Sequence, residues 1–476
     1  MGAKSHVLSM MPLALALQRN GHNVTFLQYY KDSTEKVSSE SLHFIYVKEI
    51  GISADTVIQQ LQSWKQKGAA MLPMVRIIFS AGWSCRQTLN NPEYASLYSN
   101  ITSGYWDLLF VDNVFQPCGI FLTTTTANLS WIDYSTTLLL RRTRKSRAIS
   151  MPTSTEPNLN VINYEPKSFV FRLTNTIGDM LEVATGILVA NLLPYWIEGK
   201  LKASMNVHDF HKRAIYSFGS MSPMVDFALP QAANTFAIDY SCPKPVALSK
   251  DILEFVEDPS SKGTIVLSFG HYVKWKFAAI EIVQAVSNVL NNMTNYRAIW
   301  QYDGDRNLVA TKSHVKMASW LPLPALLRHP KTVLFVNHVG IKSFLEAVCF
   351  AVPVVAIPIF GDQYRNAVLI RQRRLGIFLE KTTMDESSFR TAIDTILAQP
   401  TYKKNMEAVS AMSKEKIIDD LARGIFWIDF HFRHQKAAAH MKLKGVELCS
   451  FIFYNIDLFM LLLALTYLLC NVVAKY

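Results

Sequence analysis

Hydrophobic positions along the chain follow two alternating patterns: short β-branched runs, and longer stretches with apolar residues at helical spacing. Residues 7–19 have helical spacing and are followed by Gly21, and residues 23–28 (NVTFLQ) are then typical of a strand. Residues 106–112 (WDLLFVD) predict a second strand. Alternating strands and helices are typical of a parallel α/β architecture.

The second half of the chain shows the same alternation. A polar stretch with two prolines, around residues 239–248, predicts a linker between the halves. Two doubly wound units joined by a linker make a two-lobed α/β protein, and ligands of such sheets bind at the carboxyl ends of the strands. The further elements that we expect are strands at 264–269, 297–300, 332–337 and 352–357 and helices at 169–193, 195–207, 277–290 and 341–350.

The end of the chain carries one long apolar run, at residues 449–474. About 20 apolar residues are enough for one transmembrane helix, and the alternative is a buried core helix. A basic segment precedes the run, with Arg433, Lys436, Lys442 and Lys444. The positive-inside rule would place the main body of such a protein in the cytosol.

Composition excludes several classes of protein. Half of the 476 residues are apolar and 18% are charged, so extended disorder is excluded. The net charge of +11 comes largely from the basic segment above and from a second cluster at residues 141–147. The chain is therefore not a uniformly basic nucleic-acid binder, and we predict no nucleic-acid partner.

The six cysteines show no CxxC spacing, so we predict neither a zinc site nor a redox motif, and no metal site of another kind. They are also too sparse for a disulfide scaffold. Four Asn-x-Ser/Thr sequons give weak support to a lumenal body. These sequons are at Asn23, Asn100, Asn128 and Asn292.

Candidate chemistry is densest between residues 320 and 366. His338 directly follows the strand TVLFVN and precedes a helix that begins near Gly340. The amino end of a helix presents free N–H groups and a positive dipole end, which together bind phosphate, and glycine lets the backbone approach an anion closely. His338 can add a side-chain donor.

Three further features extend this candidate site. Glu346, two turns into the helix, could accept hydrogen bonds from ribose hydroxyls. Asp362 and Gln363 follow the strand VPVVAI and suit hydrogen bonding to sugar hydroxyls, and Trp320 could stack on a base. Taken singly, Trp320 is more often a core residue, His338 a satisfied histidine and Asp362 a turn residue. Their occurrence together favours a nucleotide-sugar site.

The stretch WLPLPALLRHPKTVLFVNHVGIKSFLEAVCFAVPVVAIPIFGDQYRNA resembles the signature region of the UDP-glycosyltransferases, in particular the animal UDP-glucuronosyltransferase branch. The resemblance extends to NGHNVTFL, WDLLFVD, PKPVALSKDILEFVED, IVLSFG and WIDFHFRH. It implies the GT-B fold, two Rossmann-like lobes with a cleft between them, and one C-terminal transmembrane helix. The segments expected are an acceptor-binding lobe at 1–240, the linker at 241–248, a UDP-sugar-binding lobe at 249–425, a basic juxtamembrane segment at 426–448 and the transmembrane helix at 449–474. The donor-binding residues expected are Trp320, His338, Gly340, Lys342, Ser343, Glu346, Asp362 and Gln363.

The resemblance also implies the activity: inverting transfer of glucuronate or glucose from the UDP-sugar to a small lipophilic acceptor, with no bound cofactor. His6 matches the family's catalytic base and Asp112 its orienting acid. A neutral histidine suits removal of a hydroxyl proton near pH 7, and a carboxylate on its other nitrogen fixes the tautomer. The implied protein is a glycoprotein anchored in the membrane of the endoplasmic reticulum with a lumenal body, and it forms homo-oligomers or hetero-oligomers with relatives.

Departures from the family pattern keep a second hypothesis open, a catalytically silent relative that binds lipophiles or pairs with active members. Val339 and Lys342 stand where the family has Gly and Asn, and Val339 adds bulk where the backbone approaches the diphosphate. Leu323, His271 and Gln301 also replace expected donor-side residues. A nucleotide-binding dehydrogenase is a weak third alternative, because no strand is followed by GxGxxG.

The start of the chain is a further departure. The family has a signal peptide and an apolar strand ahead of the catalytic histidine, and the sequence MGAKSHVLSM shows neither. That strand would be central in the first sheet. We therefore expect a first sheet with exposed ladder groups and apolar surface.

Overall fold

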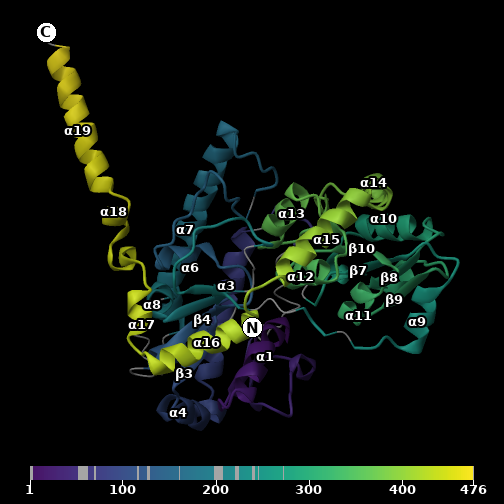
Figure 1. The fold of residues 1–476 in the computed structure, drawn as a ribbon, viewed down its shortest axis with the longest axis horizontal. Coiled ribbons are helices and arrows are strands. Elements are labelled where there is room, and N and C mark those ends of the chain that lie inside the picture. The colour runs from purple at the N-terminus through teal and green to yellow at the C-terminus, as the bar shows by residue number, and fades with distance from the viewer. Residues whose placement is uncertain are drawn as a thin grey trace.

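The protein has two α/β lobes followed by a C-terminal helix that extends away from them (Figure 1). The structure is a computed structural model. It describes residues 4–51, 63–68, 71–114, 117–125, 129–159, 161–197, 207–219, 224–238, 242–244, 246–271 and 273–474. The sequon at Asn128 lies outside these residues, as does part of the helix expected at 195–207.

The second lobe is a six-stranded parallel sheet with strand order β12-β11-β10-β7-β8-β9. Apolar side chains cover both faces: α10 and α14 pack on one, and α11, α12 and α15 on the other. This doubly wound arrangement confirms the predicted fold of the second half. The strands are β7 (Thr264–Ser268), β8 (Arg297–Gln301), β9 (Val315–Ala318), β10 (Thr332–Asn337), β11 (Val354–Ala356) and β12 (Gly376–Phe378). The helices are α9 (Lys250–Glu257), α10 (Ile280–Asn291), α11 (Leu323–Arg328), α12 (Ile341–Cys349), α13 (Gln363–Gln372), α14 (Glu386–Ala398) and α15 (Pro400–Lys414).

The first lobe contains two parallel sheets rather than one. One has the order β1-β2 and the other the order β3-β4-β5-β6. Its strands are β1 (Thr25–Tyr30), β2 (His43–Lys48), β3 (Leu108–Asp112), β4 (Ser130–Ser135), β5 (Tyr216–Gly219) and β6 (Thr235–Ala237). Its helices are α1 (Lys4–Arg19), α3 (Met71–Leu89), α4 (Ala95–Ser103), α5 (Pro117–Thr125), α6 (Arg141–Ser146), α7 (Phe169–Ile197) and α8 (Val207–Arg213).

A largely apolar cavity of about 430 Å³ lies between β1 and β3. Five consecutive residues of each strand line it, 25–29 and 108–112. Alternate residues of a strand point to opposite faces of a sheet, so residues from both faces of each strand line the cavity. One edge of β1 and one edge of β3 therefore face it. The sheet of the first lobe is therefore interrupted here.

Helix α1 holds the two sheets together. Leu13 and Leu17 share a buried cluster with Ile132 of β4, whereas Val7 and Met11 belong to a cluster that includes Phe26 of β1. The helix therefore covers the gap between the sheets and places its first turn near the carboxyl end of β3.

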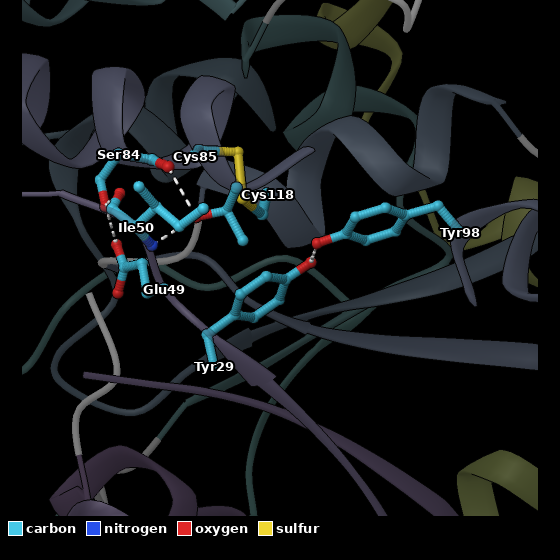
Figure 2. The surroundings of a disulfide bond; sticks show 8 residues. Tyr29, Glu49, Ile50, Ser84, Cys85, Tyr98 and Cys118 are labelled. Atoms are coloured by element: carbon cyan, nitrogen blue, oxygen red, sulfur yellow. Dashed lines mark hydrogen bonds between the residues drawn. A yellow bond between two sulfur atoms is a disulfide. The ribbon is translucent and has the colours of Figure 1, made fainter. Parts of the chain in front are cut away.

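Four of the six cysteines form two disulfides. Figure 2 shows Cys85–Cys118, which joins α3 to α5 beside the hydrogen-bonded hydroxyls of Tyr29 and Tyr98. The second, Cys242–Cys349, joins the segment after β6 to α12. The sequence did not predict these pairings, whose cysteines are 33 and 107 residues apart. Disulfides of this kind persist in oxidising compartments.

The end of the chain returns to the first lobe before it leaves the body. Ile428 of α16 (Asp420–Arg433) is buried in the cluster that contains Leu13, and Asp429 lies 2.9 Å from His22 Nε2. Part of the segment predicted as juxtamembrane, 426–448, is therefore packed against α1, and its second helix is α17 (Ala437–His440).

One helix in the described part of the chain is long and apolar enough to cross a membrane, α19 (Ile456–Val473). Its 18 residues span about 27 Å, which matches the hydrocarbon core of a bilayer. The helix begins later than the predicted residue 449 because Asn455 adopts a left-handed conformation, φ +53°, between α18 (Ser450–Phe453) and α19. Asparagine tolerates this conformation better than most residues. The side chains of α19 are exposed, so the alternative of a buried core helix is wrong.

Candidate active site

A histidine–carboxylate pair lies at the amino end of α1. His6 is in the first turn of this helix, and Asp112 is the last residue of β3. His6 Nδ1 lies 2.7 Å from Asp112 Oδ2, and both side chains are buried. Because the carboxylate accepts the Nδ1 proton, Nε2 is the nitrogen oriented to take a proton from a substrate. The fold thus brings together the two residues proposed for acid–base chemistry.

Thr136 is a third member of this group, and the sequence analysis did not identify it. Its Oγ1 lies 2.6 Å from His6 Nδ1 and donates a hydrogen bond to Asp112 Oδ1 at 3.0 Å. The residue follows β4, the parallel neighbour of β3. Residues that follow adjacent parallel strands meet at one sheet edge, so the hydroxyl in the sequence YSTT was a usable signal.

The candidate donor-binding residues lie in a row along the carboxyl edge of the six-stranded sheet. Asp362 and Gln363 follow β11, His338 follows β10, and Trp320 follows β9. The sheet order places β10 between β11 and β9, so the acidic–amide pair and the tryptophan are at opposite ends of the row. Trp320 is 69% exposed, which is suited to stacking on a base and excludes a core role.

His338, in the middle of the row, is half-buried, and its Nδ1 atom is fully buried. Burial lowers its pKa to about 4. Within the described part of the chain, its Nδ1 has no hydrogen-bond partner. Neighbouring glycines make room for the ring: a Cβ at Gly340 would lie 2.7 Å from Nε2, and one at Gly270 would lie 3.3 Å from Cε1. A buried nitrogen without a partner fits a site in which a ligand supplies one.

The amino end of α12 follows directly. Gly340 is the N-cap residue, and Lys342 and Ser343 are in the first turn, where backbone N–H groups have no partner within the helix. The amino end of this nine-residue helix is therefore a second feature, beside the ring of His338, that suits a bound anion. Further along, burial raises the pKa of Glu346 to about 7, against the opposing effect of Lys342.

The raised pKa of Glu346 gives a pH prediction. If its carboxylate accepts hydrogen bonds from ribose, a protonated Glu346 must lose its proton before UDP binds. With a pKa near 7, we expect UDP to bind about tenfold more weakly at pH 6 than at pH 8. Calorimetric titration of the protein and of Glu346→Gln at both pH values measures this difference. The variant should lose the part of the pH dependence due to Glu346, and equal profiles for the two proteins would contradict the assignment.

Asp362 and Gln363 occupy the start of α13, but they differ in what they can offer a ligand. The Oε1 atom of Gln363 accepts hydrogen bonds from the backbone N–H groups of Ile359 and Phe360, at 2.8 and 3.0 Å. This leaves the amide NH₂ group as the part of Gln363 suited to a sugar. Asp362 accepts from Asn366 Nδ2 at 3.0 Å, and burial raises its pKa.

Asp362 is within electrostatic range of His6 of the first lobe. The charge of Arg365 opposes the rise in the pKa of Asp362, and His6 does so in its protonated form. The candidate base of the first lobe therefore lies within electrostatic range of one end of the row of candidate donor-binding residues, which we call the donor row.

The structure changes the interpretation of one departure from the family pattern. Val339 has φ +52°, a left-handed conformation that is costly for a β-branched residue. Its side chain is fully buried in the core of the second lobe. The prediction that the side chain of Val339 adds bulk beside the diphosphate is therefore wrong. The residue instead strains the backbone at this position.

A second departure, Gln301, has a structural role. It accepts a hydrogen bond from Ser268 Oγ and donates one to Ser319 O, so it links β8 to its neighbours.

Sequence comparison gives whole-chain matches. The family described as UDP-glucoronosyl and UDP-glucosyl transferase matches residues 2–476. UDP-glucuronosyltransferase 1A1 of Mus musculus is 24% identical over 491 residues, covering 99% of this chain and 88% of the relative. UDP-glucuronosyltransferase 1A3 of Rattus norvegicus is 25% identical over 395 residues, covering 82% of this chain and 72% of the relative.

Solved structures show the same fold at low identity. The spinosyn forosaminyltransferase SpnP has a TM-score of 0.59 at 15% identity, covering 92% of this chain and 97% of its own. The glycosyltransferase VinC, solved in complex with dTDP, has a TM-score of 0.59 at 13% identity, covering 90% and 97%. The predicted GT-B architecture is confirmed. By its whole-chain match, the protein belongs to the family of UDP-glucuronosyl and UDP-glucosyl transferases.

Proposed function

We propose that the protein is an inverting glycosyltransferase that moves glucuronate or glucose from a UDP-sugar to a hydroxyl of a small lipophilic acceptor. One observation carries the proposal. The His6–Asp112 pair of the first lobe lies within electrostatic range of Asp362, at the end of the donor row of the second lobe. A direct displacement requires a base held close to the site of the nucleotide sugar.

In this mechanism, His6 Nε2 takes the proton of the acceptor hydroxyl while Asp112 stabilises the charged ring. The acceptor oxygen forms a bond to the anomeric carbon on the face opposite to UDP. The bond from that carbon to the phosphate oxygen breaks, and UDP leaves with the electron pair. The N–H groups that begin α12, together with His338, stabilise the charge on the diphosphate. Trp320 holds the base, and Asp362 with the amide of Gln363 holds the sugar.

We further propose that α19 anchors the protein in the membrane of the endoplasmic reticulum with both lobes in the lumen. The two disulfides favour an oxidising compartment over the cytosol, against the count of positive charges before α19. The sequons at Asn23, Asn100 and Asn292 are on exposed residues, as lumenal glycosylation requires. Association with itself or with relatives stays a prediction.

A catalytically silent relative is the second candidate function, and the strained Val339 favours it. The backbone between His338 and α12 must adopt a left-handed turn at a residue that resists it. This turn positions the groups proposed to hold the diphosphate. A silent relative would keep the fold and the anchor and lack donor affinity.

Direct UDP binding separates the two candidates without knowledge of the acceptor. We expect titration calorimetry of the full chain in lipid nanodiscs to show micromolar binding. His338→Ala should weaken it about 10- to 100-fold, because a charge-assisted hydrogen bond contributes ~1.5–3 kcal/mol. His314→Ala is the matched control, since His314 is also buried but bonds to the backbone of Leu290. No binding at millimolar UDP by folded protein would overturn the transferase proposal and support the silent relative.

A further inference from the structure

Over residues 169–186, helix α7 is oriented with its polar side against the protein and its apolar side in solvent. The side chains of Asn175 and Asp179 are buried, although both are on a 29-residue helix at the surface of the first lobe. Val170 is 66% exposed and Leu181 is 64% exposed on the same helix. This is the reverse of the usual surface helix of a water-soluble protein.

Several interactions fix this orientation. Asn175 Oδ1 accepts a hydrogen bond from Asn158 N at 2.8 Å, and its amide donates to Glu156 O at 2.7 Å. Asp179 forms an ion pair with Arg141, and Glu182 lies 3.8 Å from the same guanidinium. Rotating the helix to bury its apolar side would break this network and leave Arg141 buried beside fewer carboxylates.

The exposed side forms one continuous stripe. Its residues recur at the spacings of a single helix face and are each between 48 and 66% exposed. We name this stripe the outer face of α7; it extends for about 27 Å along the helix axis. A stripe of this length on a soluble surface marks contact with an apolar partner. It consists of Val170, Leu173, Ile177, Met180, Leu181 and Leu188.

The position of α19 indicates which partner covers this face. Helix α19 is apolar and exposed throughout, and in Figure 1 it and the amino end of α7 extend from the same side of the protein. A bilayer crossed by α19 therefore lies on the side from which α7 projects.

We propose that the outer face of α7 lies in the boundary between the headgroups and acyl chains of the bilayer that α19 crosses. The proposal rests on the membrane anchor that forms part of the proposed function. An amphipathic helix in this position buries its apolar side roughly 5–10 Å deep and keeps its polar side away from the lipid. Here the polar side is bonded to the body of the first lobe instead of to water. The contact would fix how the lobes stand over the membrane, which a single anchor helix alone does not.

Fluorescence quenching by lipids tests the contact in the full chain. Cys449 and Cys470 are the free cysteines of the described residues, so replacing both with serine gives a background without accessible thiols. An environment-sensitive fluorophore is then attached at Leu173→Cys or Leu181→Cys in phosphatidylcholine nanodiscs. Neither substitution removes a buried side chain, so folding should be kept. We expect nitroxide lipids labelled near the headgroup to quench both positions.

Two other positions make each outcome decisive. Ile417→Cys is the matched control, an exposed apolar residue between α15 and α16, and it should not be quenched. Native Cys470, kept as the sole free thiol, reports on α19. Quenching at Cys470 without quenching at residues 173 and 181 would overturn the proposal, whereas absence of quenching at Cys470 would overturn the membrane anchor itself. The fluorophores at residues 173 and 181 could instead report an apolar environment without quenching by the labelled lipids. If light scattering then showed a doubled protein mass, a second copy would cover the face and the proposal would be wrong.

Discussion

Replacing His6 with alanine is expected to lower the rate of sugar transfer by about 10²- to 10⁴-fold, the usual contribution of a positioned general base. The loss should appear in kcat, with UDP affinity unchanged, because His6 belongs to the first lobe and the donor row to the second. Asp112→Asn should cause a loss of similar size, since an amide at 2.7 Å from Nδ1 favours the wrong tautomer. Transfer to a panel of lipophilic hydroxyl compounds, with UDP release as the readout, measures both variants.

His22→Ala is the matched control for this experiment. His22 also pairs with an aspartate, Asp429, at 2.9 Å, and it follows the other end of α1. We expect this variant to transfer sugar at the rate of the unmodified protein. If His6→Ala and His22→Ala behaved alike, the base would have to be another residue.

Replacing Arg365 with methionine is expected to destabilise the protein by about 3–5 kcal/mol, the effect of breaking a buried ion pair. Arg365 of α13 is buried, lies 2.6 Å from Asp226 and 3.9 Å from Glu156, and packs on the ring of Phe227. Methionine keeps much of the packing but leaves the two carboxylates without this cation. Because these carboxylates belong to the first lobe and Arg365 to the second, the loss should also loosen the contact between the lobes. A fall in the midpoint of thermal unfolding measures the effect.

Arg390→Met is the comparison that isolates burial. Arg390 lies 2.7 Å from Asp394 on α14, and both side chains are exposed. An exposed pair of this kind contributes at most about 1 kcal/mol. Equal shifts in the unfolding midpoint for the two variants would mean that the buried pair has no special role in stability.

The second lobe was predictable from local pattern. The strand TVLFVN at 332–337 has the predicted bounds, and the helix after it ends one residue early, at Cys349. Strand β11 starts at Val354 rather than at 352, because Pro353 lacks a backbone N–H for the sheet. The row of donor candidates also followed from sequence, since residues that come directly after parallel strands share one edge.

The first lobe was less predictable, because its contacts are distant in sequence. The pattern places Thr136 at the sheet edge directly after β4, but it does not indicate that the hydroxyl lies 2.6 Å from Nδ1 of His6, a residue 130 positions earlier. Local pattern likewise does not indicate that Cys242 pairs with Cys349, because the two residues are 107 positions apart.

Sequence by itself determined the alternation of strands and helices, the family, the C-terminal apolar helix and the residue types available at the sheet edge. Each of these depends on periodicity or on a motif within a few dozen residues. Only the tertiary structure decided that His6 comes within electrostatic range of Asp362, that α16 returns to the first lobe, and that α7 turns its apolar side outward. The physical reason is that a helical pattern fixes which residues share a face, whereas the direction of that face depends on long-range partners such as Arg141 and Asn158.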